Sequence, residues 1–197
     1  MDKPDHNQKI GILGGSFNPA HAGHLEISLR ALDILKLDVV WWLVSPGNPL
    51  KSDMEMATFE TRMKSAQEKA NDPRIIVSDL ENTLGTTYTI DTLEKITEMH
   101  PEHHFVWLMG ADNLAEFDQW KSWRKIATTV PFAIFNRPSY SKPSLEGIAA
   151  NELAEHRIDQ SQANTLYSLK PPAWVYCERT NNPMSSTEIR SKNKLQQ

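Results

Sequence analysis

Two kinds of hydrophobic pattern alternate along this chain. Short apolar runs predict buried strands, and the first of them, residues 10–13, ends at Gly14 and Gly15. Residues 39–45 are branched and aromatic without a period of two, which is typical of a strand buried on both faces. Further strands are expected at residues 74–78, 104–109, 132–136 and 175–177.

Apolar residues at helical spacing fill most of the intervals between these runs. Leu25, Leu29 and Leu32 predict a helix over residues 22–36. Thr58 is the expected N-cap of a second helix, because an amphipathic pattern starts directly after it. Other helices are expected around residues 90–96, at 111–117 and at 185–193, and residues 138–170 are expected to hold one short helix and a loop.

The alternation of strands and helices predicts the fold class. It favours an α/β architecture with a doubly wound, mostly parallel sheet and helices on both faces. With 197 residues, the chain is expected to form a single domain over residues 9–193, with short tails at 1–8 and 194–197. Ligands of such sheets bind beyond the carboxyl ends of the strands, near the point where strand order reverses. The residues that follow each strand are therefore the candidates for chemistry.

Charge and composition exclude several classes of function. The net charge of −4 disfavours a general nucleic-acid binder, which would carry a basic surplus. No apolar run reaches the roughly 18 residues of a membrane span. The polar first ten residues lack the apolar core of a signal peptide, so a cytoplasmic location is expected. Cys177 is the only cysteine, which excludes an internal disulfide, and we expect it to be a small buried hydrophobe.

The turn after the first strand carries the strongest candidate chemistry, the sequence GGSFNPAHAGH at residues 14–24. Gly14 and Gly15 permit positive φ values and close approach of a ligand to the backbone. The start of the following helix offers N–H groups and a positive dipole end, which suits phosphate. His21 and His24, three positions apart in the first helical turn, are expected to project on one face. The turn therefore predicts a polyanion site beside two imidazoles. Zinc ligation by the pair is an alternative, although no third ligand is evident nearby.

This turn resembles the GG[ST]F[DN]PxHxGH signature of the HxGH nucleotidylyltransferase superfamily. Near the other end of the chain, residues 185–190 (SSTEIR) resemble the second signature of that superfamily, ISSTxIR. Residues 46–51 (PGNPLK) and 86–92 (TTYTIDT) resemble one branch, the nicotinate-nucleotide adenylyltransferases. The resemblance covers residues 9–193 and implies a Rossmann-like form of the predicted sheet. Asn18 stands where many relatives have Asp, and we expect it to form a turn as Asp would.

The resemblance implies an enzyme that transfers AMP from ATP to nicotinate mononucleotide in NAD biosynthesis. The products are nicotinate adenine dinucleotide and pyrophosphate, formed by direct in-line attack without a covalent intermediate. His24, His21 and Arg190 are the implied catalytic residues. Mg²⁺ is expected with the ATP, held more by phosphates and water than by the protein, so no metal ligand is assigned. The residues implied to bind ATP and its phosphates are Gly14, Gly15, Ser16, Phe17, Lys51, Ser186, Thr187 and Arg190.

The same resemblance implies where the rest of the two substrates binds. Gly110, Asp112 and Arg137 are the implied nucleotide and ribose contacts. For the mononucleotide, Trp120 is implied to stack on the pyridine ring, and backbone amides near Thr87 and Tyr88 to meet the ring carboxylate. Simpler roles stay open for several of these residues: a solvated lysine for Lys51, an N-cap for Asp112, a salt bridge for Arg137 and core packing for Trp120.

Two other functions stay open at this point. The same fold with another acceptor, such as phosphopantetheine or nicotinamide mononucleotide, is the nearer alternative, and residues 86–92 with Trp120 favour the pyridine acceptor. A nucleotide-binding module without catalysis is the other, and the intact His21, His24 and Arg190 argue against it. ATP and nicotinate mononucleotide are the expected partners, with no nucleic acid and no membrane, and the oligomeric state is open.

Overall fold

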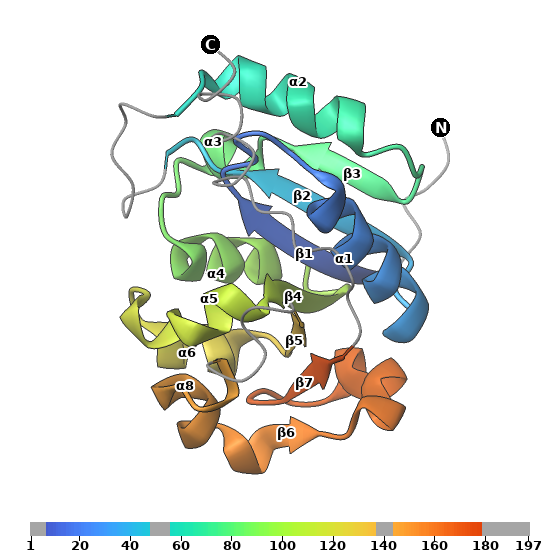
Figure 1. Cartoon of the computed structure of the whole chain (residues 1–197), viewed down its shortest axis with the longest axis vertical. Coiled ribbons are helices and arrows are strands. Elements are labelled where there is room, and N and C mark those ends of the chain that lie inside the picture. The colour runs from blue at the N-terminus through green and yellow to red at the C-terminus, as the bar shows by residue number, and fades with distance from the viewer. Residues whose placement is uncertain (1–6, 48–55, 137–143, 179–197) are drawn as a thin grey trace, which may run out of the picture.

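One parallel sheet organises the protein. The computed structural model describes residues 7–47, 56–136 and 144–178. Seven strands pair in the order β3-β2-β1-β4-β5-β7-β6 (Figure 1), and each pair is parallel. The strands are β1 (Lys9–Gly15), β2 (Val39–Val44), β3 (Ile75–Ser78), β4 (His104–Gly110), β5 (Phe132–Phe135), β6 (Arg157–Ile158) and β7 (Trp174–Cys177).

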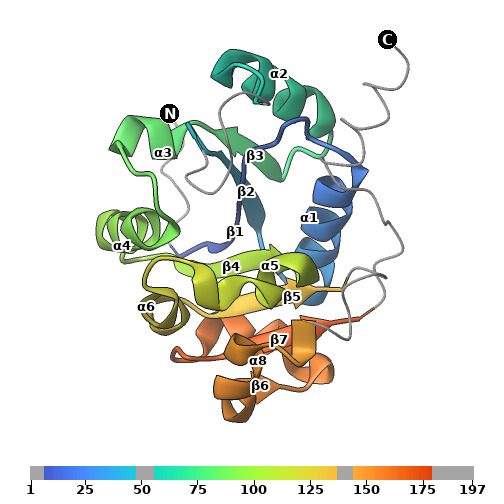
Figure 2. The ribbon, with the colours of Figure 1, turned by 60° about the vertical axis from the view of Figure 1, so that its left-hand side comes forward.

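Helices lie on both faces of this sheet. The α-helices are α1 (Ala22–Ile34), α2 (Phe59–Lys69), α3 (Leu80–Leu84), α4 (Thr89–Met99), α5 (Ala111–Ala115), α6 (Trp123–Thr129) and α8 (Ile148–Glu152), and the 3-10 segments are η2 (Phe117–Gln119), η3 (Ala154–His156) and η4 (Gln160–Ser168). One apolar layer contains residues of α1, α2 and η4, and the other contains residues of α4, α5, α6 and α8. Figure 2 shows α1 and α4 on opposite sides of β1. The predicted doubly wound α/β sheet is confirmed.

The central strands show why their sequences lack alternation. In β2, Trp42 and Val44 pack into the layer that contains α1, whereas Trp41 and Leu43 pack into the layer that contains α4. Successive side chains of a strand point to opposite faces, so a strand covered on both sides is apolar at every position. Helix α2 begins as predicted, because Thr58 Oγ1 accepts the Thr61 N–H at 3.3 Å.

The differences from the sequence prediction lie in short elements. Helices α3 and α6 and strand β6 were not expected, and at five, seven and two residues they are too short to show a period. The helix predicted over 111–117 ends at Ala115 and continues as η2. The described part of residues 138–170 holds α8, β6 and two 3-10 segments rather than one helix and a loop.

Two further expectations concern the ends of the chain and the membrane. The predicted helix at 185–193 lies outside the described residues, and the domain limits at 9 and 193 stay predictions. Within the part of the chain that the structure describes, none of the helices combines the length and the apolar character needed to cross a bilayer.

Candidate active site

The predicted site lies where strand order reverses. Strands β1 and β4 are neighbours, and the chain leaves them for β2 on one side and β5 on the other. Their register pairs Ile12 with Trp107, and extending it brings Gly15 level with Gly110. The turn after β1 and the start of α5 after β4 therefore meet at one edge of the sheet. This edge is the usual ligand site of a doubly wound fold.

The turn of residues 14–24, which we call the histidine turn, is fixed by aromatic packing. Phe17 is 1% exposed and adopts φ +46°, in the left-handed region that a bulky side chain rarely occupies. Its ring stacks on Trp42 at 5.0 Å between centroids and contacts the His24 ring at 4.6 Å. Buried packing against β2 thus holds a backbone conformation that would be costly in a free loop.

The two histidines form a reciprocal cap at the start of α1. His21 is the N-cap residue, and its Nδ1 accepts the Gly23 N–H at 3.1 Å. His24 Nδ1 accepts the His21 N–H at 3.2 Å, and the two ring centroids are 3.9 Å apart. His21 therefore precedes the helix instead of lying in its first turn, which corrects the sequence prediction, although the rings are adjacent as expected. Because each Nδ1 accepts a hydrogen bond, each neutral ring carries its proton on Nε2.

A buried chain of hydrogen bonds anchors His24 to the sheet. Trp42 Nε1 donates to Ser28 Oγ at 2.7 Å, and Ser28 Oγ donates to the His24 carbonyl at 2.9 Å. Trp42 and Ser28 are both fully buried. The backbone of His24 is thus tied to β2 through Ser28, whose bond to Trp42 is buried, and this pre-organises the His24 Nε2–H as a donor.

Gly14 is needed for a different reason from the one predicted. Neither Gly14 nor Gly15 has a positive φ, so that expectation is wrong. A Cβ at Gly14 would lie 2.5 Å from Trp107 Cη2, whereas at Gly15 it would meet only the Phe17 ring, 3.6 Å away. Gly14 therefore lets the Trp107 indole pack directly against β1.

Arg62 is an organising residue that sequence reasoning missed. Its side chain, 2% exposed, donates to the carbonyls of Ser16, Ser45, Pro46 and Ala57 at 2.7–3.1 Å. Burial lowers the pKa of this guanidinium. Arg62 thus ties the histidine turn to the loop after β2 and to the start of α2. The signal for it was its place on the apolar stripe of α2, between Phe59 and Ala66, where a charge needs partners.

Asn18 also links the histidine turn to the start of α2. Its Oδ1 accepts the Ala57 N–H at 3.2 Å, and Ser65 Oγ accepts the Ala20 N–H at 3.1 Å. Asn18 lies in a turn, as predicted, and it also contacts a segment that is distant in sequence. Two helices, α1 and α2, share one rigid junction at this edge of the sheet.

The proposed mononucleotide side is formed by residues 85–92, which we call the threonine turn, and by the segment around Trp120. Thr87 and Tyr88 are exposed at the start of α4, where no side chain caps the helix. Trp120 is half-buried and meets Phe117 edge-on at 5.6 Å. Lys121 joins the two segments, with Nζ 4.1 Å from the Tyr88 ring centroid and 3.2 Å from Asp91 Oδ2. The structure thus brings Tyr88 and the residue after Trp120 together.

The other residues assigned from the sequence divide into two groups. Gly110 is the N-cap of α5, and Asp112 lies half-buried in its first turn, so the simple reading of Asp112 as N-cap is wrong. Cys177 is fully buried, which raises the pKa of its thiol to about 12 and makes it the inert hydrophobe expected. The assigned residues that lie outside the described part of the chain are Lys51, Arg137, Ser186, Thr187 and Arg190.

A second histidine cluster lies at the opposite, amino end of the sheet. His100, Glu102 and His103 place one ligand atom each within 4.8 Å of one another. However, His103 Nδ1 accepts the Gln8 N–H at 3.1 Å, so its Nε2 carries a proton and faces Glu102 Oε1 at 3.5 Å. A metal on that Nε2 would require loss of this proton or of the Gln8 bond. We therefore interpret the cluster as a polar contact between the end of α4 and the start of β4.

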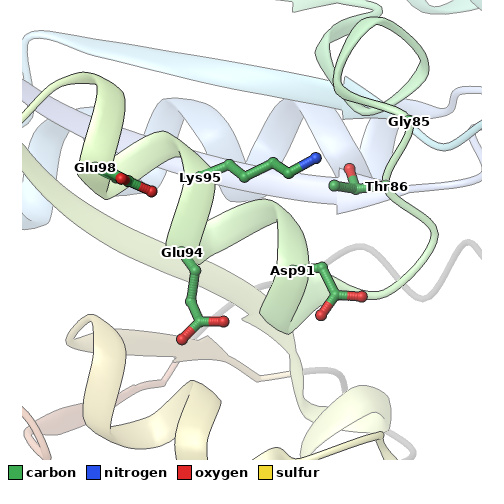
Figure 3. Close-up of a pocket in the computed structure, with 6 residues that line it drawn as sticks. All are labelled: Gly85, Thr86, Asp91, Glu94, Lys95 and Glu98. Atoms are coloured by element: carbon green, nitrogen blue, oxygen red, sulfur yellow. The ribbon is translucent and has the colours of Figure 1, made fainter.

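A shallow groove of about 400 Å³ lies against the threonine turn. Gly85, Thr86, Lys95 and the carboxylates of Asp91, Glu94 and Glu98 line it (Figure 3). Three acids against one lysine would repel a phosphate chain. The groove is therefore unsuited to the phosphate chain of a nucleotide.

Comparison with known proteins identifies the family. A family model described as Cytidylyltransferase-like matches residues 12–192. A Parvibaculum lavamentivorans protein named "Probable nicotinate-nucleotide adenylyltransferase" is 48% identical over 184 residues, which are 93% of this chain and 92% of that protein. An Agrobacterium fabrum protein of the same name is 43% identical over 94% of this chain and 99% of its own length.

A solved structure agrees on the fold. The Plasmodium falciparum nicotinic acid mononucleotide adenylyltransferase complexed with NaAD has a TM-score of 0.70 to this chain at 22% identity. The match covers 94% of this chain and 83% of that one. The long alignments to sequence relatives and the match to the family model together place the protein: the chain belongs to the nicotinate-nucleotide adenylyltransferases, a branch of the cytidylyltransferase-like nucleotidyltransferases.

Proposed function

We propose that this enzyme transfers the AMP group of ATP to nicotinate mononucleotide and releases pyrophosphate and nicotinate adenine dinucleotide. The observation that carries the proposal is the reciprocal cap of His21 and His24, which fixes two adjacent imidazole rings at the carboxyl end of β1. The relatives named above supply the substrate class. The proposed location of the reaction is the cytoplasm.

The chemistry needs alignment and charge stabilisation more than it needs a protein nucleophile. The phosphate of the mononucleotide is itself the nucleophile, and it attacks the α-phosphorus of ATP in line with the bond to pyrophosphate. The new P–O bond forms as the bond to the β-phosphate oxygen breaks, and the electron pair leaves with pyrophosphate. In our proposal, His24 Nε2–H donates to an α-phosphate oxygen, where negative charge increases in the transition state. His21 contacts the phosphate chain beside it.

The remaining assignments extend the same proposal along the two substrates. The N–H groups at residues 15–17 face the triphosphate, and Lys51 and Arg190, with Ser186 and Thr187, neutralise its outer phosphates. Gly110, Asp112 and Arg137 contact ribose and nucleotide. Mg²⁺ enters bound to ATP, because a hard cation that keeps phosphate and water ligands needs no carboxylate cage from the protein.

Steady-state kinetics on alternative acceptors test the proposal. Pyrophosphate release is measured with ATP and each of three acceptors: nicotinate mononucleotide, nicotinamide mononucleotide and phosphopantetheine. We expect the highest kcat/KM with the nicotinate compound, because a site with N–H donors favours a carboxylate over an amide. An equal or higher value with the amide would contradict the proposed acceptor. No release with any acceptor would favour a binding module.

A further inference from the structure

A buried carboxyl group lies beneath the threonine turn, and the proposed mechanism does not use it. Glu81 of α3 is 5% exposed, and the hydroxyls of Thr86 and Thr92 beside it belong to side chains 3% and 0% exposed. Helices α3 and α4 contact each other, and Figure 2 shows them on the same side of β1, with α3 above α4. Three polar side chains removed from water in one spot need a closed set of hydrogen bonds.

The hydrogen bonds run from Glu81 to the backbone on both sides of the turn. Thr92 Oγ1 lies 3.3 Å from Glu81 Oε1, 2.8 Å from Thr86 Oγ1 and 3.3 Å from the Tyr88 carbonyl. The Thr86 N–H donates to the Glu81 carbonyl at 3.0 Å. Gly85, at φ +63°, turns the chain between them. The network thus ties α3, the turn and the first turn of α4 into one unit.

The protonation state of Glu81 decides the direction of this network. Burial raises the pKa of Glu81 to about 7, against the opposing bond from Thr92. Each threonine hydroxyl has one proton to donate. With Glu81 protonated, its O–H donates to Thr92, and Thr92 is left to donate to Thr86 or to the Tyr88 carbonyl. With Glu81 ionised, Thr92 must donate to the carboxylate, and the Tyr88 carbonyl loses that donor.

The neighbouring charges are already engaged elsewhere. From α4, Lys95 Nζ donates to the Leu84 carbonyl at 2.7 Å, and Figure 3 shows it reaching towards Thr86 along the outside of the turn. Asp91, also on α4, pairs with Lys121 of the segment before α6. On the β2 side, Val39 and Trp41 join the apolar cluster against which Leu80 and Leu84 of α3 pack. The bonds of Glu81 that the structure describes are therefore those to the threonine turn.

We propose that Glu81 is a positioning residue for the acceptor: through Thr92 and Thr86 it sets the conformation of residues 86–88, whose backbone receives the ring carboxylate. This inference rests on the proposed function and adds to it a residue that touches neither substrate. Thr87 and Tyr88 are exposed while Thr86 is buried, so the buried half of the turn controls the half that meets the ligand. Acceptor affinity, and the preference for acid over amide, depend on Glu81, whereas ATP affinity does not.

Variants of the full-length enzyme test this assignment. Glu81→Met removes the hydrogen bonds at similar volume, Thr92→Val removes the central hydroxyl, and Glu81→Gln keeps a neutral donor. Glu98→Gln changes an exposed acid of α4 outside the network and is the matched control. KM for nicotinate mononucleotide and for ATP, kcat, and the acid-to-amide ratio are measured at about pH 6 and about pH 8, on either side of the proposed titration.

The expected result is a selective change in the acceptor parameters. Glu81→Met and Thr92→Val raise KM for the mononucleotide about tenfold, as for a buried polar group left without its partner, and lower the acid-to-amide ratio. KM for ATP stays within about twofold in each, as it does in the control. In the wild-type enzyme, KM for the mononucleotide is higher at the higher pH, where Glu81 is ionised. Glu81→Gln has the wild-type KM at the lower pH and keeps that value at the higher pH. Thr92→Val keeps the test valid if Glu81→Met does not fold.

Three results would overturn the assignment. They are an unchanged acceptor KM in folded Glu81→Met and Thr92→Val, an equal rise in both KM values, or a Glu81→Gln variant as impaired as Glu81→Met. The proposed function fails separately: wild-type enzyme that forms no product from nicotinate mononucleotide would reject that function and, with it, this inference. Wild-type turnover with unaffected variants rejects the inference alone.

Discussion

The histidine turn and the threonine turn stand at the same edge of the sheet but are held in different ways. In the histidine turn, aromatic packing of Phe17 on Trp42, backbone bonds to His21 and His24, and the buried Arg62 fix the geometry. These contacts are ring packing and hydrogen bonds to or from backbone groups. The threonine turn depends instead on hydroxyls and a carboxyl that titrates near neutrality.

This difference matches the demands of the two proposed substrates. A triphosphate presents the same charges in every reaction of the fold, so a rigid set of donors serves it. The enzyme must distinguish nicotinate mononucleotide from its amide, in which one oxygen of the ring carboxylate is replaced by NH₂. Such discrimination depends on donors placed to within fractions of an ångström. A turn held by a small polar network can be tuned by few substitutions, whereas a turn held by packing cannot.

Removing Arg62 should give the largest effect, on stability. Arg62→Met removes a buried side chain and the donors to four backbone carbonyls, and we expect a loss of about 3–5 kcal/mol in the free energy of unfolding. Urea denaturation followed by circular dichroism measures it. Arg74→Met, which removes an exposed arginine paired with Asp72, is the control and should change little. A small loss for Arg62→Met would show that the histidine turn is held by aromatic packing alone.

Removing His24 should give the next largest effect, on turnover. Loss of one pre-organised donor to the developing charge costs on the order of 3 kcal/mol, or about a hundredfold or more in kcat. We expect His24→Ala to show this loss while its ATP affinity, measured by calorimetry, changes little. His156→Ala, at an exposed position, is the control. Near-normal turnover in His24→Ala would contradict the proposed role.

Glu81 should make stability depend on pH. The pKa of Glu81 is about 7 in the folded protein, above the ordinary value of 4.5. The contribution of Glu81 to the free energy of unfolding is therefore fully present below about pH 4.5 and is lost as the pH rises through about 7. The loss is on the order of 3 kcal/mol, because the unfolded chain ionises first and each unit between the two pKa values is worth about 1.4 kcal/mol. The glutamine of Glu81→Gln cannot ionise, so this variant should not lose that stability. The difference in free energy of unfolding, variant minus wild type, should therefore rise by this amount between about pH 4.5 and pH 8. A constant difference across this range would contradict the burial argument.

Truncating Trp120 should give the smallest of these effects, confined to the acceptor. Loss of a stacked ring is worth about 1–1.5 kcal/mol, so Trp120→Ala should raise KM for nicotinate mononucleotide about tenfold. KM for ATP should stay near the wild-type value. An equal fall in both affinities would assign Trp120 to core packing with Phe117, the alternative that its edge-on contact supports.

The fold and the histidine turn could be predicted from the sequence because their signals are local. Apolar runs mark the strands of a sheet covered on both faces, and GGSFNPAHAGH occupies one continuous turn at the end of the first of them. Arg62 and Glu81 could not be assigned in this way. Their roles depend on carbonyls and hydroxyls that the fold brings to them, such as Ser16 O and Thr92 Oγ1.

Short elements were the other limit of prediction. Helix α3 has five residues, too few to show a period, and it is the element that carries Glu81. Gly14 shows a related limit: the sequence marks a position without a side chain, but only the structure shows that the Trp107 indole fills the space. In both cases the missing information is a neighbour distant along the chain.

Tracing the AMP group tests the central claim most directly. The wild-type enzyme is incubated with ATP labelled at the α-phosphate, Mg²⁺ and nicotinate mononucleotide, and the label is followed in the protein, in AMP and in the dinucleotide. We predict that the label passes to nicotinate adenine dinucleotide in a one-to-one ratio with released pyrophosphate, and that none remains on the protein. Label in AMP alone, or bound covalently to the protein, would contradict a direct transfer between the two substrates.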